Sequence, residues 1–372
     1  MSLIQYLARI QFGVGARATL AEEAAIAGIE RPLVISDRDL VAGGVLAAAL
    51  ESFGDHALPQ YLEVPSNPPE RVVHAALQVY RDAGCDGVIA VGGGSVLDTG
   101  KAVALLAQQG GRLEDYMART GGSGRIRRIA PFVGVPTTAG TGSEIGRGAA
   151  ITLDDGEKAV FLSPNLVPAA AVCDPELTLG LPPSLTAATG IDAFTHAFEA
   201  FLSSAYNPPA DAVALDAIER LHRWLPRAVA DGSDLAARTE VMMGATEAAM
   251  TTWKGLGATH ALSMPFDDLG LHHGTLVGVL LPHTIEYLRD AVPAERLTRV
   301  ARALSATAET LSDELARFTA SLALPTSLAA MGVPEDFLDR AAAIAEGTAF
   351  NQTVPRPLAA SQYRALAQAA FT

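Results

Sequence analysis

Four side chains in the second half of this sequence are of the kinds that bind a metal ion. Asp192 and His196 are four residues apart in a run, residues 190–199, that we expect to be one helix, so the two side chains share a face. His260 and His273 follow, and the whole chain has only eight histidines. One carboxylate and three imidazoles suit Fe²⁺ or Zn²⁺ and leave coordination positions open for a substrate. Such an ion would polarise a carbonyl oxygen and stabilise an alkoxide, which hydride transfer requires.

Two other interpretations of these residues stay open. An acid and a histidine four residues apart are more often a buried, satisfied pair than two ligands, and only the further histidines favour a metal. His272 directly precedes His273 and could be the ligand in its place.

A glycine-rich turn follows the short apolar run at residues 87–91. Gly92, Gly93, Gly94 and Ser95 lead directly into a predicted helix. Glycines let the backbone approach a ligand closely, and a helix N-terminus presents free N–H groups to an anion such as a diphosphate. A tight strand-to-helix turn with Ser95 as the helix cap is the alternative, and the spacing is not the Gly-x-Gly-x-x-Gly fingerprint.

A second polar loop, residues 136–144, follows the predicted strand 132–135. Ligands of open α/β sheets bind beyond the carboxyl ends of the strands, so two such loops favour a nucleotide site. Asp37 ends another predicted strand and could accept hydrogen bonds from a ribose diol, which favours NAD over NADP. The alternatives are an exposed Thr/Gly loop, and Asp37 or Asp39 acting only as a helix cap.

Strands and helices alternate in the first half of the chain. Apolar β-rich runs lie at residues 31–37, 61–64, 87–91, 132–136 and 169–174, with helical patterns at 40–52, 69–83 and 95–108. This alternation predicts a parallel sheet covered on both faces. Residues 149–153 and 159–162 predict a β-hairpin.

From residue 184 onward nearly all patterns are helical, at 185–202, 210–228, 235–250 and 276–288, with prolines such as Pro282 expected to start or break helices. We therefore expect an α/β dinucleotide-binding domain over residues 1–176 and an all-α metal- and substrate-binding domain over 177–372.

Composition narrows the class of protein. Apolar residues make up 49% and charged residues 18% of 372 residues, which supports large cores and excludes disorder. A net charge of −14 disfavours nucleic acid and anionic membranes as partners. Two cysteines without a Cys-x-x-Cys pattern fit a reducing compartment. With no signal-peptide pattern and no apolar run long enough to span a bilayer, we expect a cytoplasmic protein.

These motifs, in this order, resemble those of the iron-containing (group III) alcohol dehydrogenases over nearly the whole chain. The resemblance rests on Phe12-Gly13-Val14-Gly15, on Gly92-Gly93-Gly94-Ser95 with Asp98 and Lys101, on residues 136–144, on Asp174-Pro175, on Gly190-Ile191-Asp192-Ala193 with His196 and Glu199, on His260-Ala261-Leu262, and on His273-Gly274 with Leu281-Pro282-His283.

The resemblance implies a fold, a set of site residues and an oligomeric state. The fold would be the dehydroquinate synthase-like architecture, with a cleft between the two domains and commonly a homodimer or larger oligomer. The metal ligands would be Asp192, His196, His260 and His273, with His272 as a further catalytic candidate. The implied cofactor contacts are Asp37, Gly93, Gly94, Ser95, Asp98, Thr137, Thr138, Thr141 and Lys158.

The chain departs from the family pattern after the third ligand. The family usually has a second histidine four residues after His260, and here that residue is Met264. A thioether carries no proton, so a proton relay would run through water, the ribose or His272. Asp267 and Asp268 are also less usual in this loop. One hypothesis is that Lys254 faces the cleft and favours an anionic substrate, and the alternative is a solvated surface lysine.

The sequence thus predicts a metal-dependent, NAD-linked alcohol dehydrogenase that interconverts a small polar alcohol, which could be anionic, and its aldehyde or ketone. A lyase resembling dehydroquinate synthase is one alternative, although that group has a glutamate as its first metal ligand and many basic residues. A degenerate, non-catalytic nucleotide-binding protein is the other, motivated by Met264.

Overall fold

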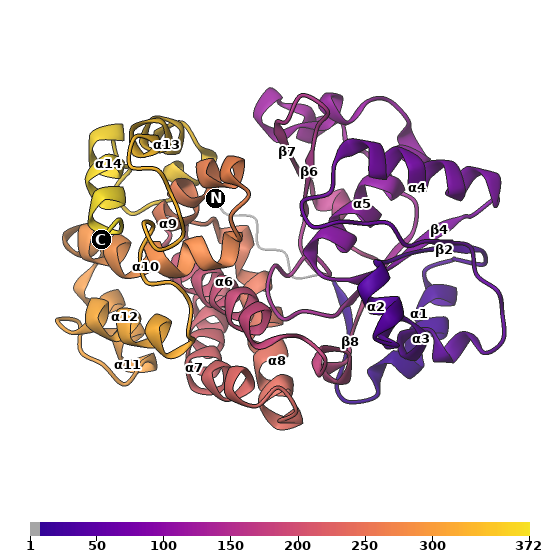
Figure 1. The fold of residues 1–372 in the computed structure, drawn as a ribbon, viewed down its shortest axis with the longest axis horizontal. Coiled ribbons are helices and arrows are strands. Elements are labelled where there is room, and N and C mark those ends of the chain that lie inside the picture. The colour runs from indigo at the N-terminus through magenta and orange to yellow at the C-terminus, as the bar shows by residue number, and fades with distance from the viewer. Residues whose placement is uncertain (1–7) are drawn as a thin grey trace. The chain divides into compact units, whose positions relative to one another are not determined.

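The computed structural model describes residues 8–372, which form two compact units (Figure 1). Among the described residues, one unit comprises 8–138 and 142–180, and the other comprises 181–372 together with 139–141. The sequence had suggested a boundary at residue 176, and the units divide between Gly180 and Leu181.

A six-stranded, fully parallel sheet forms the centre of the N-terminal unit, in the order β1-β8-β5-β4-β2-β3. The four inner strands are buried along their whole length, as their continuous apolar sequences require. The strands are β1 (Arg9–Phe12), β2 (Pro32–Ile35), β3 (Gln60–Tyr61), β4 (Gly87–Gly92), β5 (Phe132–Pro136) and β8 (Ala170–Cys173).

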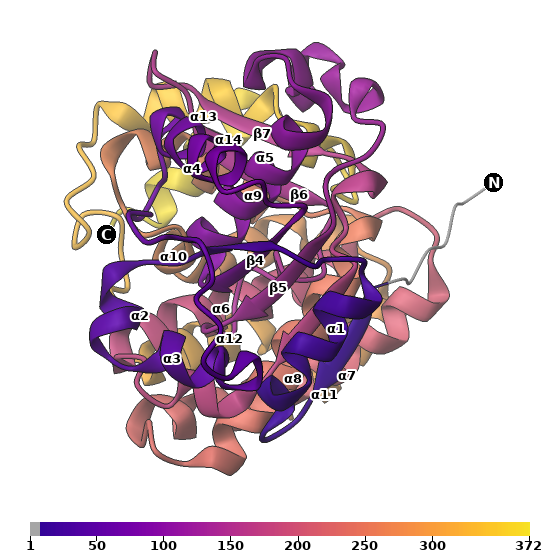
Figure 2. The ribbon, with the colours of Figure 1, turned by 90° about the vertical axis from the view of Figure 1, so that its right-hand side faces the viewer.

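Helices cover both faces of this sheet (Figure 2). One face packs on α4 (Glu70–Asp82) and α5 (Gly94–Gln109), and the other on α1 (Leu20–Ile26) and α3 (Val45–Ala49). The predicted doubly covered parallel sheet is confirmed. The hairpin is confirmed as well, with β6 (Gly148–Thr152) antiparallel to β7 (Lys158–Leu162).

In this unit one local prediction was wrong and one strand was missed. The helix expected over residues 40–52 is interrupted, because α2 (Arg38–Ala42) ends at Gly43 and Gly44 adopts φ +73°, a left-handed conformation that glycine tolerates. The edge strand β1 was not predicted at all.

The C-terminal unit is helical in the part of the chain from residue 181 onward. Its central helix is α6, which is buried over most of its length and packs against α7, α8 and α10. The helices are α6 (Pro183–Leu202), α7 (Pro208–Ala230), α8 (Leu235–Thr251), α9 (Ala258–Ser263), α10 (His273–Leu288), α11 (Ala294–Ala303), α12 (Leu311–Ser321), α13 (Phe337–Glu346) and α14 (Ala360–Ala369). Within residues 8–372, none of the helices is long and apolar enough to cross a membrane.

Pro282 does not break its helix, contrary to the prediction. Helix α10 begins at His273 and continues through Pro282 to Leu288. Proline has no N–H, so the carbonyl of Gly278, four residues earlier, lacks its usual helical partner. The hydroxyl of Thr319 on α12 donates to that carbonyl at 3.3 Å, which compensates for the missing bond.

Candidate metal centre and nucleotide-binding loops

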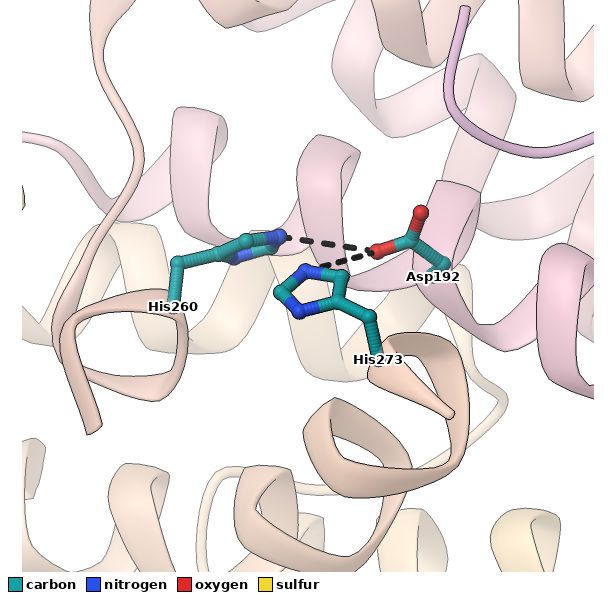
Figure 3. Close-up of side chains that lie close together, drawn as sticks. All are labelled: Asp192, His260 and His273. Atoms are coloured by element: carbon teal, nitrogen blue, oxygen red, sulfur yellow. Dashed lines mark ion pairs between the residues drawn. The ribbon is translucent and has the colours of Figure 1, made fainter. Parts of the chain in front are cut away.

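One carboxylate oxygen of Asp192 lies at the centre of the candidate metal site. Helix α6 presents Asp192 and His196 on one face, α9 carries His260, and α10 begins with His273. The Nε2 atoms of these three histidines lie 3.7, 3.6 and 3.7 Å from Asp192 Oδ1, in that order. Figure 3 shows Asp192, His260 and His273 converging from three separate helices.

These distances and the burial of the site fit a bound cation. Asp192 Oδ1 and His260 Nε2 are buried and have no hydrogen-bond partner, which is costly unless something else pairs them. Two ligand atoms that are each about 2.1 Å from one ion are at most about 4.2 Å apart, and the three separations around Asp192 Oδ1 satisfy this limit. Asp192, His260 and His273, whose ligand atoms also lie close to one another, therefore fit a divalent ion such as Fe²⁺ or Zn²⁺.

The protonation states also suit metal binding. Burial lowers the pKa of His196 to about 4, so its imidazole is neutral near pH 7 and has a lone pair to offer. Burial acts to raise the pKa of Asp192, but the neighbouring imidazoles outweigh it and the pKa of this carboxyl lies below its usual range. For His260 burial acts to lower the pKa, but the carboxylates of Asp192 and Glu199 outweigh it and raise the pKa to about 9, so an ion has to displace a proton from this ring. The site thus combines an ionised carboxylate with one imidazole that is already neutral and one that gives up a proton to the metal.

The structure distinguishes His273 from its neighbour. The ligand atoms of Asp192, His260 and His273 all lie within 4.8 Å of one another, whereas His272 is exposed at the N-cap of α10 and lies outside that cluster. His196 also lies outside it and is tied to the site by the 3.7 Å separation between its Nε2 and Asp192 Oδ1. Met264 is half-buried at the C-cap of α9. Asp267 Oδ1 lies 3.6 Å from the remote nitrogen, Nδ1, of His273.

The suggestion that Lys254 faces a substrate was wrong, and so was the solvated alternative. Its side chain is 1% exposed, and the ammonium group donates to Asp211 Oδ1 at 2.6 Å and to the carbonyls of Ala200 and Phe201. Arg296 also pairs with Asp211, at 2.8 Å. Lys254 is therefore part of a buried ion cluster that binds the C-terminal end of α6, where cations are favoured by the helix dipole.

Glu199 has a structural role that the sequence motif alone did not give. It follows His196 by three residues on α6, and its carboxylate contacts Nδ1 of the candidate ligand His260 at 2.6 Å. The available signal was its spacing, which places Glu199 on the same helix face as Asp192 and His196.

The predicted cofactor residues of the N-terminal unit gather at one edge of the sheet. Strands β2, β4 and β5 are neighbours, and Asp37, the turn of Gly93, Gly94 and Ser95, and the pair Thr137 and Thr138 follow their carboxyl ends. The loops after β4 and β5 touch, since a Cβ on Gly93 would lie 3.3 Å from Thr138 Cγ2. This arrangement, with α5 starting at the glycine turn, can hold a dinucleotide diphosphate.

Other predicted cofactor residues have protein partners. Asp37 Oδ1 accepts a hydrogen bond from the N–H of Leu40 at 2.9 Å, which caps α2. Asp98 accepts from Ser143 Oγ at 2.6 Å and from the N–H of Ala150 at 2.9 Å, so it fastens the loop after β5.

Lys158 and Thr141 belong to segments other than the glycine turn. Lys158 is the first residue of β7, opposite Thr152. Thr141 belongs to the short segment 139–141 that groups with the C-terminal unit. Cofactor contact by Asp37, Asp98, Lys158 and Thr141 remains a prediction.

Comparison with known proteins shows which family this chain is similar to. The family described as iron-containing alcohol dehydrogenase matches residues 8–175, and the C-terminal family of the Fe-containing alcohol dehydrogenases matches residues 186–371. The chain belongs to the iron-containing alcohol dehydrogenase family. It is therefore a metal-dependent, nicotinamide-linked oxidoreductase that acts on CH–OH groups. These matches give no support to the lyase or to the non-catalytic alternative.

Individual relatives of this dehydrogenase cover it from end to end. The 4-hydroxybutyrate dehydrogenase of Cupriavidus necator is 44% identical over 375 residues, which cover 98% of each chain. Among solved structures, 1,3-propanediol oxidoreductase matches with a TM-score of 0.93 and 30% identity, covering 100% of both chains. The sulfoacetaldehyde reductase of Bifidobacterium kashiwanohense, solved with NAD⁺, has a TM-score of 0.90 and 25% identity, covering 100% of this chain and 99% of that one.

Proposed function

We propose that this dehydrogenase interconverts a small ω-hydroxy acid, such as 4-hydroxybutyrate, and its aldehyde, with NAD as the hydride carrier. The observation that carries the activity is the convergence of three imidazoles on Asp192 Oδ1 at 3.6–3.7 Å. The substrate class is supported by the 44% identity to a 4-hydroxybutyrate dehydrogenase and by the likeness to a reductase of another anionic aldehyde.

The proposed metal ligands are Asp192, His196, His260 and His273. A divalent ion bound there supplies the Lewis acidity that lowers the pKa of an alcohol and stabilises the resulting alkoxide. Asp192 contributes the one negative charge among these ligands, while the imidazoles hold their lone pairs toward the same point. The C-terminal unit is therefore the proposed metal- and substrate-binding domain.

The N-terminal unit is the proposed dinucleotide-binding domain. The N-terminus of α5, with Gly93, Gly94 and Ser95, would bind the diphosphate, and Thr137, Thr138 and Thr141 would line its polar surroundings. Asp37 would accept hydrogen bonds from the ribose hydroxyls and repel a 2′-phosphate, which favours NAD over NADP. Asp98 and Lys158 are proposed to lie near the cofactor.

Proton transfer in this chain needs a group other than the residue four positions after His260. Met264 has no titratable group. We therefore assign this role to His272, which is exposed beside His273 and would carry the alcohol proton to solvent. The buried thiols of Cys85 and Cys173 are not joined in a disulfide, which suits the reducing environment of the cytoplasm, the proposed location. A homodimer is the proposed assembly.

A substrate and cofactor screen tests this proposal. Apo enzyme reloaded with Fe²⁺ or Zn²⁺ should reduce NAD with 4-hydroxybutyrate, monitored at the reduced-nicotinamide absorbance band. The matched neutral substrate is 1-butanol, which should be turned over with a lower kcat/KM. Asp192→Asn should abolish both metal binding and turnover. A preference for 1-butanol would refute the substrate class, and a preference for NADP would refute the role of Asp37.

A further inference from the structure

Glu199 lies directly behind the candidate metal centre, on the same face of α6 as two of the proposed ligands. It is 5% exposed and follows Asp192 by seven residues and His196 by three, which brings all three side chains to one side of the helix. It therefore reaches the segment that carries His260.

The carboxylate of Glu199 is fully engaged with that segment. Oε2 lies 2.6 Å from His260 Nδ1 and accepts from the N–H of Gly257 at 2.9 Å, while Oε1 accepts from the N–H of Thr259 at 2.6 Å. Each oxygen thus has at least one charge-assisted hydrogen bond. The carboxylate holds both the backbone at the start of α9 and the ring of its histidine.

This contact determines which nitrogen of His260 faces the metal centre. An ionised carboxylate can only accept, so Nδ1 must carry the proton that it donates to Glu199. In a neutral imidazole the lone pair is then on Nε2, which is the atom 3.6 Å from Asp192 Oδ1. His260 Nε2 has no other hydrogen-bond partner.

The backbone around Glu199 is shaped for this approach. A Cβ at Gly257 would lie 2.7 Å from Glu199 Oε1 and 2.9 Å from its Cδ, so any larger residue would push the carboxylate away. The absence of a side chain at position 257 permits the hydrogen bonds described above.

We propose that Glu199 is the positioning residue for the metal in this enzyme: it fixes the tautomer and the ring orientation of His260 so that Nε2 coordinates the ion. This inference rests on the metal site given under the proposed function. Carboxylates that hold the remote nitrogen of a ligand histidine make the imidazole a more basic ligand, and their loss typically weakens metal binding about 10–100-fold.

Zinc affinity of the full-length enzyme, measured by competition with a chromophoric chelator, tests the proposal. Glu199→Gln should bind Zn²⁺ about 10–100-fold more weakly, because an amide cannot accept from both the His260 ring and the Thr259 N–H. In the Co²⁺-loaded enzyme, the paramagnetically shifted proton signal of the His260 N–H should exchange faster with solvent in the variant.

Asp211→Asn is the matched control, since Asp211 is a buried carboxylate of the same unit that contacts no proposed ligand. It should lower thermal stability and leave Zn²⁺ affinity unchanged. If Glu199→Gln fails to fold, Gly257→Ala displaces the carboxylate without removing it and should weaken Zn²⁺ binding in the same direction.

The outcomes separate this inference from the function on which it rests. Wild-type affinity in Glu199→Gln, or an equal loss of affinity in Asp211→Asn, would overturn the role of Glu199 and leave the metal site intact. A wild-type enzyme that binds no Zn²⁺ or Fe²⁺ at all would instead overturn the proposed metal centre.

Discussion

Gly274 should be indispensable for the metal centre, although it contributes no side chain. It follows His273 at the start of α10 and faces α6, and a Cβ added there would lie 1.9 Å from the carbonyl oxygen of Ala188 and 2.7 Å from its carbon. Both are backbone atoms, so no side-chain rotation can relieve the overlap. Gly274→Ala must therefore separate the two helices that carry His273 and Asp192.

The size of this separation follows from the contact distance. Ordinary non-bonded contact requires roughly 3.5 Å, so α10 has to move by about 1.5 Å relative to α6 near Ala188. Metal–ligand bonds tolerate deviations of only about 0.2 Å, so His273 would lose its place in the site. We expect a loss of about 3 kcal/mol in unfolding free energy, the upper end for overpacking. Misplacement by about 1 Å alone costs roughly a hundredfold in rate.

Metal content, unfolding temperature and kcat/KM measure this effect. The control is Gly278→Ala, one turn later on α10, where a Cβ would lie 3.1 Å from Ile191 Cγ1, a side-chain atom that can shift. It should change stability by less than about 1 kcal/mol and should retain the metal. If Gly274→Ala binds one metal equivalent with wild-type affinity and stability, the close packing of α10 on α6 does not position His273.

Three further perturbations follow from the structure. Thr319→Val should lower the unfolding free energy, measured with denaturant, by about 1–2 kcal/mol because it leaves the Gly278 carbonyl unpaired. Adding Pro282→Ala returns an N–H to that carbonyl and should restore most of the loss. If the double variant instead shows the sum of the two single effects, the compensation by Thr319 is refuted. Burial raises the pKa of Glu247 to about 8, so its protonated form stabilises the fold fully below the unfolded value of about 4.3, and this contribution is lost as pH rises through 8. The unfolding temperature should thus fall between pH 5 and 8, and Glu247→Gln should flatten that decline; an unchanged profile would refute it. Lys254→Met should lower the unfolding free energy by about 3 kcal/mol and leave the ratio of kcat/KM for anionic and neutral aldehydes unchanged. A selective loss of kcat/KM for anionic aldehydes would show that Lys254 does contact the substrate.

The parallel sheet could be predicted because its inner strands are continuous apolar runs separated by helical patterns. Strand β1, with the sequence Arg-Ile-Gln-Phe, escaped prediction because it is short, lies at the sheet edge and is only partly buried, so it lacks an apolar signature. The interruption between α2 and α3 depends on the backbone conformation at Gly44, and a pair of glycines in a helical pattern does not reveal it.

At the metal centre, spacing predicted part of the arrangement and tertiary packing decided the rest. The interval of four residues placed Asp192 and His196 on one helix face. No spacing connects these to His260 and His273, whose convergence depends on how α9 and α10 pack against α6. The error over Lys254 has the same origin, because its partner Asp211 lies 43 residues away in sequence.

The proposed ligands come from three helices, so a bound ion would act as a cross-link within the helical unit. Holding α6, α9 and α10 at one point couples the occupancy of the site to the folding equilibrium, by about 2.7 kcal/mol when free metal is at one hundred times its Kd. A cell short of this metal would then lose more than turnover: the unloaded chains would open more often and reach proteases sooner. The amount of folded enzyme would thereby follow the supply of its metal.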